Sequence, residues 1–390
     1  MVIQNIKKTI NAGKKEIKSA VVGIEKHIEK PTVVIKIDEK TFFRIDEFID
    51  KCLNDLVHDE AYNRDHPVTS ELDEQFQICL ALAKLDIRVK QKNGFAHDPN
   101  VSADAILQDT RDFYQWLDRD VPNNRKFSPK IERLITTDCN VHLWDEWKVV
   151  REDGSVKNEY RASCLSRKRI GENQYENGHI FISTKPDIRN RKSGPHEFAH
   201  ALGRGYWYDE RHKSEELVEM VTVPIDLMSN QFFGEKYPDR KADYMRTQAI
   251  WYEQVCNEAK DSLADACFMK IAGGQMSVAE FNAKYRAIIG ESRLANRCQN
   301  YKNNDFEPMH EYRYTIPNLV SFKVMQDFAQ DRAGTIARLQ DILEKETLLT
   351  TQQAFNILGI NMTKQELVQN FASNYKKSLR VLNKETTIQK

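Results

Sequence analysis

The chain has 390 residues, enough for two or three domains or for one large lobed domain. Hydrophobic residues make up 40% and charged residues 30%, which excludes a wholly disordered chain and allows a sizeable core. Lys+Arg and Asp+Glu both number 58, and this zero net charge argues against a nucleic-acid partner, because such binding rests on excess cationic charge.

Membrane and secretory signals are not recognisable in the sequence. No apolar run reaches the roughly 18 residues needed to cross a bilayer, so no membrane partner is expected. The first 30 residues mix Lys, Glu, Asn and Gln and lack an apolar signal core. We therefore expect a cytoplasmic protein, or alternatively one delivered to another cell without a classical signal. The 7 cysteines form no CxxC pair, which favours reduced thiols over disulfides or a Cys-ligated zinc.

The first third of the chain has helical periodicity. Apolar residues from Ile3 to Ile24 recur at helical spacing and predict an amphipathic helix. The segment VVIKI at 33–37 predicts a short strand or an extended connection. Further helices are predicted at about 41–58, 70–90 and 103–118, so we predict an N-terminal helical region over 1–128.

The pattern changes between about 132 and 185. Four strand-like pieces occur there, LITT at 134–137, VHLWDEWKVV at 141–150, EYRASCLS at 159–166 and HIFIST at 179–184. Turn-forming residues separate them, which predicts a small antiparallel sheet. From residue 193 the pattern is helical almost to the end, with long amphipathic stretches at 318–345 and 363–383.

One motif stands out, His196-Glu197-Phe198-Ala199-His200. Two His at positions i and i+4 lie on one helix face, where their imidazoles can converge on one tetrahedral zinc. Glu197 would then lie beside the metal, where it can take a proton from a water. The preceding Gly194-Pro195 predicts the first helical turn, and Gly203 follows where the helix would end.

A zinc hydrolase of this kind needs a third protein ligand. The metzincin pattern fails because Tyr206 occupies the position of its third His. The gluzincin pattern places a Glu on the next helix, and Glu219 lies 19 residues after His200, in a predicted helix that starts at Ser214. Three alternative ligands lie in the same segment: Glu215, which could also orient a ligand, Glu216, and the less favoured His212.

The motif and the segments after it resemble a known family. HEFAHAL at 196–202 and LVEMVTVPIDLM at 217–228 are similar to the zinc-binding helices of the oligoendopeptidase F and thimet oligopeptidase family. Weaker similarities follow in the family's order, at 178–184, 271–282, 309–314 and 355–363. The resemblance covers roughly 140–385, with a shortened N-terminal half.

The resemblance implies a mainly α-helical, zincin-like (gluzincin) metallopeptidase fold with a small antiparallel sheet beside the active-site helix. It implies that the strand at 178–184 pairs with bound peptide. It also implies that the segment containing His310, Tyr312 and Tyr314 faces the zinc, where a hydroxyl or imidazole N–H would stabilise an oxyanion. His310 and Tyr314 are favoured, since residues four apart share a helix face.

These observations predict a zinc-dependent metalloendopeptidase with its catalytic region at 129–390. Zn²⁺ would be held by His196, His200 and Glu219, with Glu197 as the general base. The partner would be a peptide or protein substrate. Two alternatives stay open: a dedicated protease effector that acts on one or few host proteins, and a catalytically inactive peptide-binding protein of the same fold.

Overall fold

The computed structural model describes residues 34–36, 42–85, 97–144, 147–150, 156–159, 162–172, 174–208, 212–303 and 307–388. The chain divides into two compact units, Met1–Cys52 and Leu53–Lys390. In the first unit, β1 (Val34–Lys36) pairs antiparallel with β2 (Phe42–Arg44). Helix α2 (Ile45–Val57) begins in this unit and ends in the second. The strand predicted at 33–37 is thereby confirmed, and the helix predicted from Ile3 lies outside the described residues.

The second unit is mainly helical, as predicted. Its α-helices are α3 (Glu60–Asp65), α4 (Ser70–Ala83), α5 (Ala103–Leu117), α6 (Ser128–Arg133), α7 (Ile188–Leu202), α8 (Arg204–Tyr208), α9 (Thr222–Lys236), α10 (Lys241–Ala272), α11 (Val278–Lys284), α12 (Arg286–Ile289), α13 (Glu291–Lys302), α14 (Tyr312–Gln330), α15 (Arg332–Leu343), α16 (Thr351–Leu358) and α17 (Lys364–Ile388). Tighter turns are η1 (Asn123–Arg125), η3 (Glu215–Val218) and η4 (Pro238–Arg240). The helices predicted near 70–90 and 103–118 correspond to α4 and α5.

The predicted small sheet is present, but its pairing is mixed. The strands are β3 (Cys139–Trp144), β4 (Trp147–Val150), β5 (Val156–Glu159), β6 (Ser163–Leu165), β7 (Lys168–Gly171), β8 (Gln174–Glu176) and β9 (Gly178–Ser183). The central sheet has the order β3-β9-β6, with β3 parallel and β6 antiparallel to β9. The intervening hairpins β4-β5 and β7-β8 give the chain the length that a parallel return requires.

One predicted strand is wrong. The LITT segment lies in a π-helical turn, η2 (Leu134–Asp138), which continues α6. Thr136 and Thr137 donate hydroxyl hydrogen bonds to the carbonyls of Glu132 and Arg133, four residues earlier, at 2.8 and 3.0 Å. These local bonds favour the helical turn over the extended form that β-branched residues suggest in isolation.

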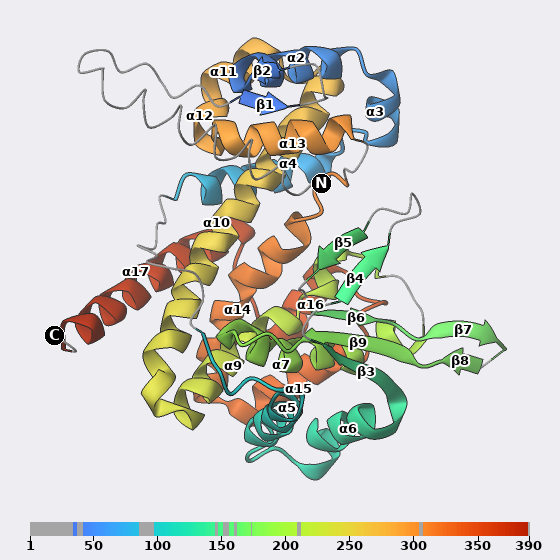
Figure 1. Cartoon of the computed structure of the whole chain (residues 1–390), viewed down its shortest axis with the longest axis vertical. Helices are drawn as coiled ribbons and strands as arrows, with labels where there is room; N and C mark the ends of the chain where they lie inside the picture. The colour runs from blue at the N-terminus through green and yellow to red at the C-terminus, as the bar shows by residue number, and fades with distance from the viewer. Residues whose placement is uncertain are drawn as a thin grey trace, which may run out of the picture. The chain divides into compact units, whose positions relative to one another are not determined.

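Helix α7, which carries the His-Glu motif, is packed on several sides. It contacts α5 and α9, and the inner face of the sheet through β6 and β9, as Figure 1 shows. Ile180 and Ile182 on β9 are fully buried, while the alternate His179 and Phe181 lie on the other face. α14 packs against α9 and η3 on the far side of the motif. This packing fixes the motif in the interior of the unit.

Three further sequence expectations bear on the unit. All 7 cysteines are free thiols, and every one except Cys164 is buried. No helix in the described part of the chain combines the length and apolar character that a bilayer crossing needs. Helix α5, which precedes residue 128, packs on α7, which follows it. The division into a helical region and a catalytic region after residue 128 concerns function and stays a prediction.

Candidate metal centre

Helix α7 begins earlier than the sequence indicates. Its N-cap is Asp187, whose carboxylate accepts a hydrogen bond from the Arg189 backbone at 2.7 Å. Pro195 therefore lies inside the helix rather than in its first turn, and the predicted start is wrong. Gly194 allows the close approach of α5, because a Cβ there would lie 2.2 Å from Thr110 Oγ1. The predicted end is confirmed, with Gly203 as the C-cap.

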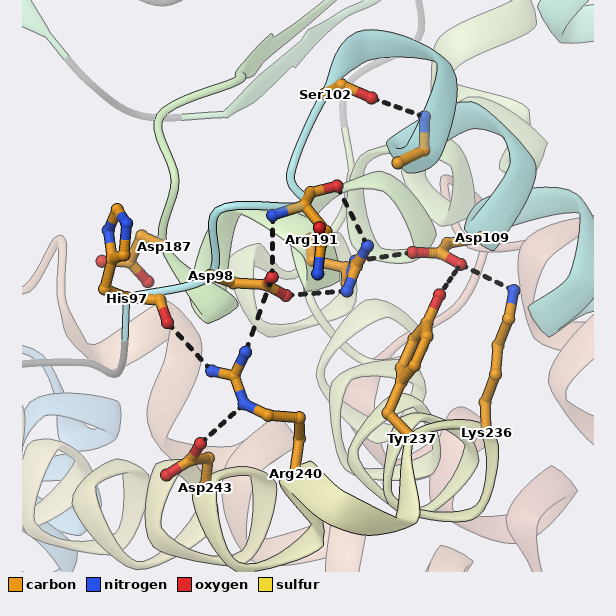
Figure 2. Close-up of polar contacts among 12 residues, drawn as sticks. His97, Asp98, Ser102, Asp109, Asp187, Arg191, Lys236, Tyr237, Arg240 and Asp243 are labelled. Carbon is orange, nitrogen blue, oxygen red and sulfur yellow. Dashed lines mark hydrogen bonds and ion pairs between the residues drawn. The ribbon is translucent and has the colours of Figure 1, made fainter.

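A buried ion network holds the N-terminal half of α7 (Figure 2). Arg191 is 5% exposed and forms 2.7 Å ion pairs with both Asp98 and Asp109. Asp109, on α5, also accepts 2.7 Å contacts from Lys236 and from the Tyr237 hydroxyl at the end of α9. Because opposite charges with several hydrogen bonds compensate each other's desolvation, this network sets the rotation of α7 between α5 and α9. The His-Glu motif starts between one and two turns further along.

The three predicted ligands converge. The Nε2 atoms of His196 and His200 are 3.2 Å apart. Glu219 Oε2 lies 3.7 Å from the first and 3.6 Å from the second. Ligand atoms bound tetrahedrally at about 2.0–2.1 Å from one ion are separated by about 3.3–3.4 Å. The spacing and the His₂Glu donor set therefore fit a zinc ion.

Glu219 reaches the two imidazoles from a turn and not from a helix. The helix predicted from Ser214 is the single 3₁₀ turn η3, and α9 begins only at Thr222. Glu219 is the C-cap of η3 and is 4% exposed. The Thr222 hydroxyl donates to its Oε2 at 2.6 Å, which orients the carboxylate. Buried carboxylates need such donors, and this one also fixes the ligand's direction.

None of the described alternatives to Glu219 joins the two imidazoles. Glu216 is buried and accepts a hydrogen bond from the Thr351 hydroxyl, in a different cavity. His212 Nε2 is 3.4 Å from a carboxylate oxygen of Glu346. His212 lines a cavity next to the motif, but it does not belong to the group formed by His196, His200 and Glu219. The Glu215 side chain is outside the described part of the chain. Among the described residues, His196, His200 and Glu219 form the group that could hold a metal ion, and we call it the candidate metal group.

Asp226, which sequence reasoning missed, contacts the first His. Its Oδ2 lies 3.1 Å from His196 Nδ1, the ring nitrogen that faces away from the ligand cluster. A carboxylate in this position fixes the tautomer and orientation of a metal-bound imidazole. An Asp within the apolar run VTVPIDLM was the available signal, because a charge there must be buried and paired.

The protonation equilibria of the cluster follow from burial and charge. Burial favours neutral His196, but the charge and hydrogen bond of Asp226 outweigh it and raise the His196 pKa to about 10. Burial lowers the pKa of His200 to about 4, which keeps its lone pair available for a metal. Burial, together with Glu219 and Asp226, raises the pKa of Glu197 to about 8. A carboxyl group with a pKa near neutrality is suited to proton transfer in both directions.

Two cavities meet at the motif. One, of about 520 Å³, and another, of about 870 Å³, share His196, Glu197 and Tyr314 as lining residues. The larger cavity also contains His200, Glu219 and residues 162–164 at the start of β6. Glu197 is 6% exposed, so its contact with free space is confined to these cavities. An extended ligand could therefore lie across the motif, with one part in each cavity.

The three residues predicted to stabilise an oxyanion differ in whether they line the two cavities. Tyr314 lines both cavities and His310 lines the smaller one. His310 is half-exposed, and its Nδ1 contacts Glu307 and Arg313 at 2.8 Å each. Tyr312 is 3% exposed, lines neither of these cavities, and its hydroxyl has no hydrogen-bond partner among the described residues. This placement favours Tyr314 over Tyr312.

The strand predicted to bind peptide, β9, is paired on both sides over half its length, and its pairing with a peptide stays a prediction. β9 pairs with β3 on one side and β6 on the other over residues 179–181, so its backbone groups are used within the sheet. β6 is the edge strand next to the motif, and Ser163 and Cys164 line the larger cavity. An added strand needs a free edge, so β6 is the available partner for a peptide backbone.

Comparison with known proteins supports the same fold. No family model matches the chain, and no curated protein sequence matches it. A crystal structure of a candidate oligoendopeptidase F superposes with a TM-score of 0.52 and 12% identity, over 87% of this chain and 57% of that one.

The fold resembles oligoendopeptidase F. A second candidate oligoendopeptidase F, from Bacillus anthracis str. Ames, has 10% identity and a TM-score of 0.48 over 86% of this chain and 56% of its own. The chain thus spans little more than half the length of the oligoendopeptidase F structures it resembles. At these identities the likeness concerns the zincin-like fold, and function rests on the residues of the site.

Asp226→Asn is expected to weaken zinc affinity roughly 10–100-fold, because the neutral amide no longer supports the charge and orientation of His196. Competition with a chromogenic chelator would measure the dissociation constant. Asp341→Asn serves as the control, since Asp341 pairs with Arg125 at 2.8 Å and lines neither site cavity. Equal affinities in the two variants would show that Asp226 does not support the candidate metal group.

Proposed function

We propose that the protein is a zinc-dependent metallopeptidase, with its catalytic region at 129–390. The observation that carries the proposal is the convergence of His196, His200 and Glu219 at zinc-like spacing, beside the carboxylate of Glu197, where two cavities meet. A metal group, a base and an open path for an extended ligand are the parts that peptide hydrolysis requires.

The chain's residues divide the chemistry between them. His196, His200 and Glu219 would hold the ion, which when bound supplies a Lewis acid for the carbonyl and lowers the pKa of a water. Glu197 takes the proton of the attacking water on its carboxylate and then donates it to the leaving nitrogen. Asp226 holds the His196 ring in place during the reaction.

The substrate would be an extended peptide. No described strand pairs with the outer edge of β6, which can offer backbone donors and acceptors beside the cavity that Glu197 lines; a peptide added there gains ladder hydrogen bonds independent of its side chains. Specificity would then come from the side chains that line the two cavities.

Tyr314→Phe is expected to lower kcat roughly 10²–10³-fold with little change in KM. Tyr314 lines both cavities, and a hydroxyl donor that meets the negative charge only in the transition state affects kcat selectively. Tyr312→Phe is the matched control and should leave kcat nearly unchanged, because Tyr312 lies outside the site cavities. His310→Ala, in the smaller cavity alone, should be measured beside them. A larger loss in Tyr312→Phe than in Tyr314→Phe would contradict this assignment.

The proposal as a whole is tested by metal analysis of the purified full chain together with an unbiased peptide-library digest. We expect about one zinc per chain, and cleavage that stops with a chelator and returns with added zinc. Zinc without cleavage of the library would instead leave the two alternatives, a protease restricted to one or few protein substrates and a catalytically inactive peptide-binding protein. Absence of both metal binding and cleavage would overturn the proposal.

A further inference from the structure

The smaller cavity has an acidic wall that the proposed chemistry does not use. Opposite α7, helix α10 contributes Glu258 and Asp261, and the start of α14 contributes Glu311 and Asn318. The cations that line the cavity, Arg189 and Lys192, come from α7 instead. Glu197 on α7 and Asp226 on α9 also line the cavity, so carboxylates outnumber the Lys and Arg side chains and only the α10 and α14 side has no Lys or Arg in its lining.

Two of the three carboxylates on this wall have no cationic partner. Asp261 is neutralised by Arg293 at 2.6 Å. Glu258 accepts a 2.8 Å hydrogen bond from the neutral amide of Gln254, and no described cation pairs with Glu258 or Glu311. Neighbouring carboxylates without a counter-charge repel each other, and this repulsion disfavours the empty cavity.

Asn318 gives an independent indication that a donor is missing. It is 3% exposed, it lines the same cavity, and its side-chain Oδ1 has no hydrogen-bond partner among the described residues. A buried acceptor without a partner is destabilising, because it has lost its hydrogen bonds to water. A ligand that brings N–H donors would satisfy the amide and neutralise the carboxylates together.

The electrostatics of Glu258 agree with this. Burial and the charges of Glu311, Asp261 and Glu219 together raise the pKa of Glu258 to about 8, against the opposing hydrogen bond from Gln254. A cation beside Glu258 would reverse this effect, since an opposite charge within a few ångströms favours the ionised carboxylate.

We propose that Glu258, Glu311 and Asn318 form a subsite for a cationic group of the bound peptide. This rests on the proposed peptidase function, because the subsite adjoins Glu197 and Tyr314 in one cavity. The cation is a lysine or arginine side chain, or the free α-amino group of a short peptide. Each of these groups has N–H donors and a positive charge. A side-chain cation would make binding depend on the peptide's sequence, whereas the α-amino group would make it depend on a free N-terminus.

The test is a binding measurement, so that it does not depend on turnover. Fluorescent peptides are titrated into the metal-free full chain, and anisotropy gives their dissociation constants. One set is N-acetylated and compares lysine with acetyl-lysine at each position in turn. The other set lacks lysine and arginine and compares a free with an acetylated N-terminus. We expect about tenfold or stronger binding of the cationic member in one of the sets, the range for a charge-assisted hydrogen bond.

The variants locate the effect. Glu258→Gln and Glu311→Gln should each reduce the preference to roughly threefold or less, and the double variant should abolish it. Glu291→Gln is the control and should keep the full preference, because Glu291 lies on α13 in an ion pair with Arg286. Both side chains are only partly buried and the changes are isosteric, so circular dichroism should show unchanged folding.

Each outcome has a separate meaning for the two proposals. A preference lost in the two Glu variants supports the subsite even if no peptide is ever cleaved, in which case the peptidase function alone fails. Absence of any preference in the wild-type chain, or a preference that survives in the double variant, overturns the subsite. Cleavage of neutral peptides by the double variant would then show that the peptidase function stands without it.

Discussion

The Glu197→Gln variant is expected to keep its fold and its zinc but to lose peptide hydrolysis by about 10³–10⁴-fold. The amide has nearly the same shape as the carboxylate, yet it cannot accept the proton of the attacking water or return it to the leaving nitrogen. Single-turnover assays on a quenched peptide would measure the loss, and metal analysis would confirm that zinc is retained.

The matched control for this variant is Glu216→Gln. Both Glu residues are 6% exposed, but Glu216 accepts a hydrogen bond from Thr351 in a cavity that excludes the candidate metal group. It should therefore affect stability and not the rate. If Glu197→Gln cleaves peptide at a rate close to that of the wild type, the assignment of the base is wrong.

Replacing any one of the three ligands should reduce zinc from about one equivalent to a small fraction. His196→Ala, His200→Ala and Glu219→Ala each remove a donor from a set of three, and the remaining pair cannot complete the tetrahedral geometry. Zinc per chain after exhaustive dialysis gives the result directly. Activity should fall in parallel in all three variants.

Neighbouring residues provide the controls for the ligand assignment. His212→Ala should retain zinc, because His212 stands apart from the candidate metal group, beside Glu346. Glu215→Ala should weaken binding by about 10–100-fold at most, as expected for a residue that orients a ligand. A greater loss of zinc in Glu215→Ala than in Glu219→Ala would transfer the third ligand to Glu215.

Local pattern was sufficient for the residues whose spacing is set by one helix. His196 and His200 lie four apart, and a helical repeat of 3.6 places them on one face in any fold that keeps the helix. Glu197 follows for the same reason. The two long amphipathic stretches were also predictable from periodicity. Helices α14 and α15 overlap the first predicted segment, and α17 overlaps the second.

Partners distant in the chain required the tertiary structure. Asp226 is 30 residues from His196, and no sequence spacing specifies that contact. Glu219 was predicted by its distance from the motif, but the 3₁₀ turn that presents it was not, because Ser214 resembles a helix N-cap without making the capping bond. A short turn held by tertiary contacts leaves little local signal.

The candidate metal site was predictable from the motif, because helical periodicity places the imidazoles of His196 and His200 on one face with Glu197 next to them. The way in which this site meets a ligand depends on the packing of the chain. That packing placed β9 in the centre of the sheet and β6 at its edge, directed Tyr314 into the cavities and Tyr312 into the core, and set an acidic wall across from α7. Strand order and side-chain direction depend on which surfaces are buried against each other, and that is a property of the whole packed chain.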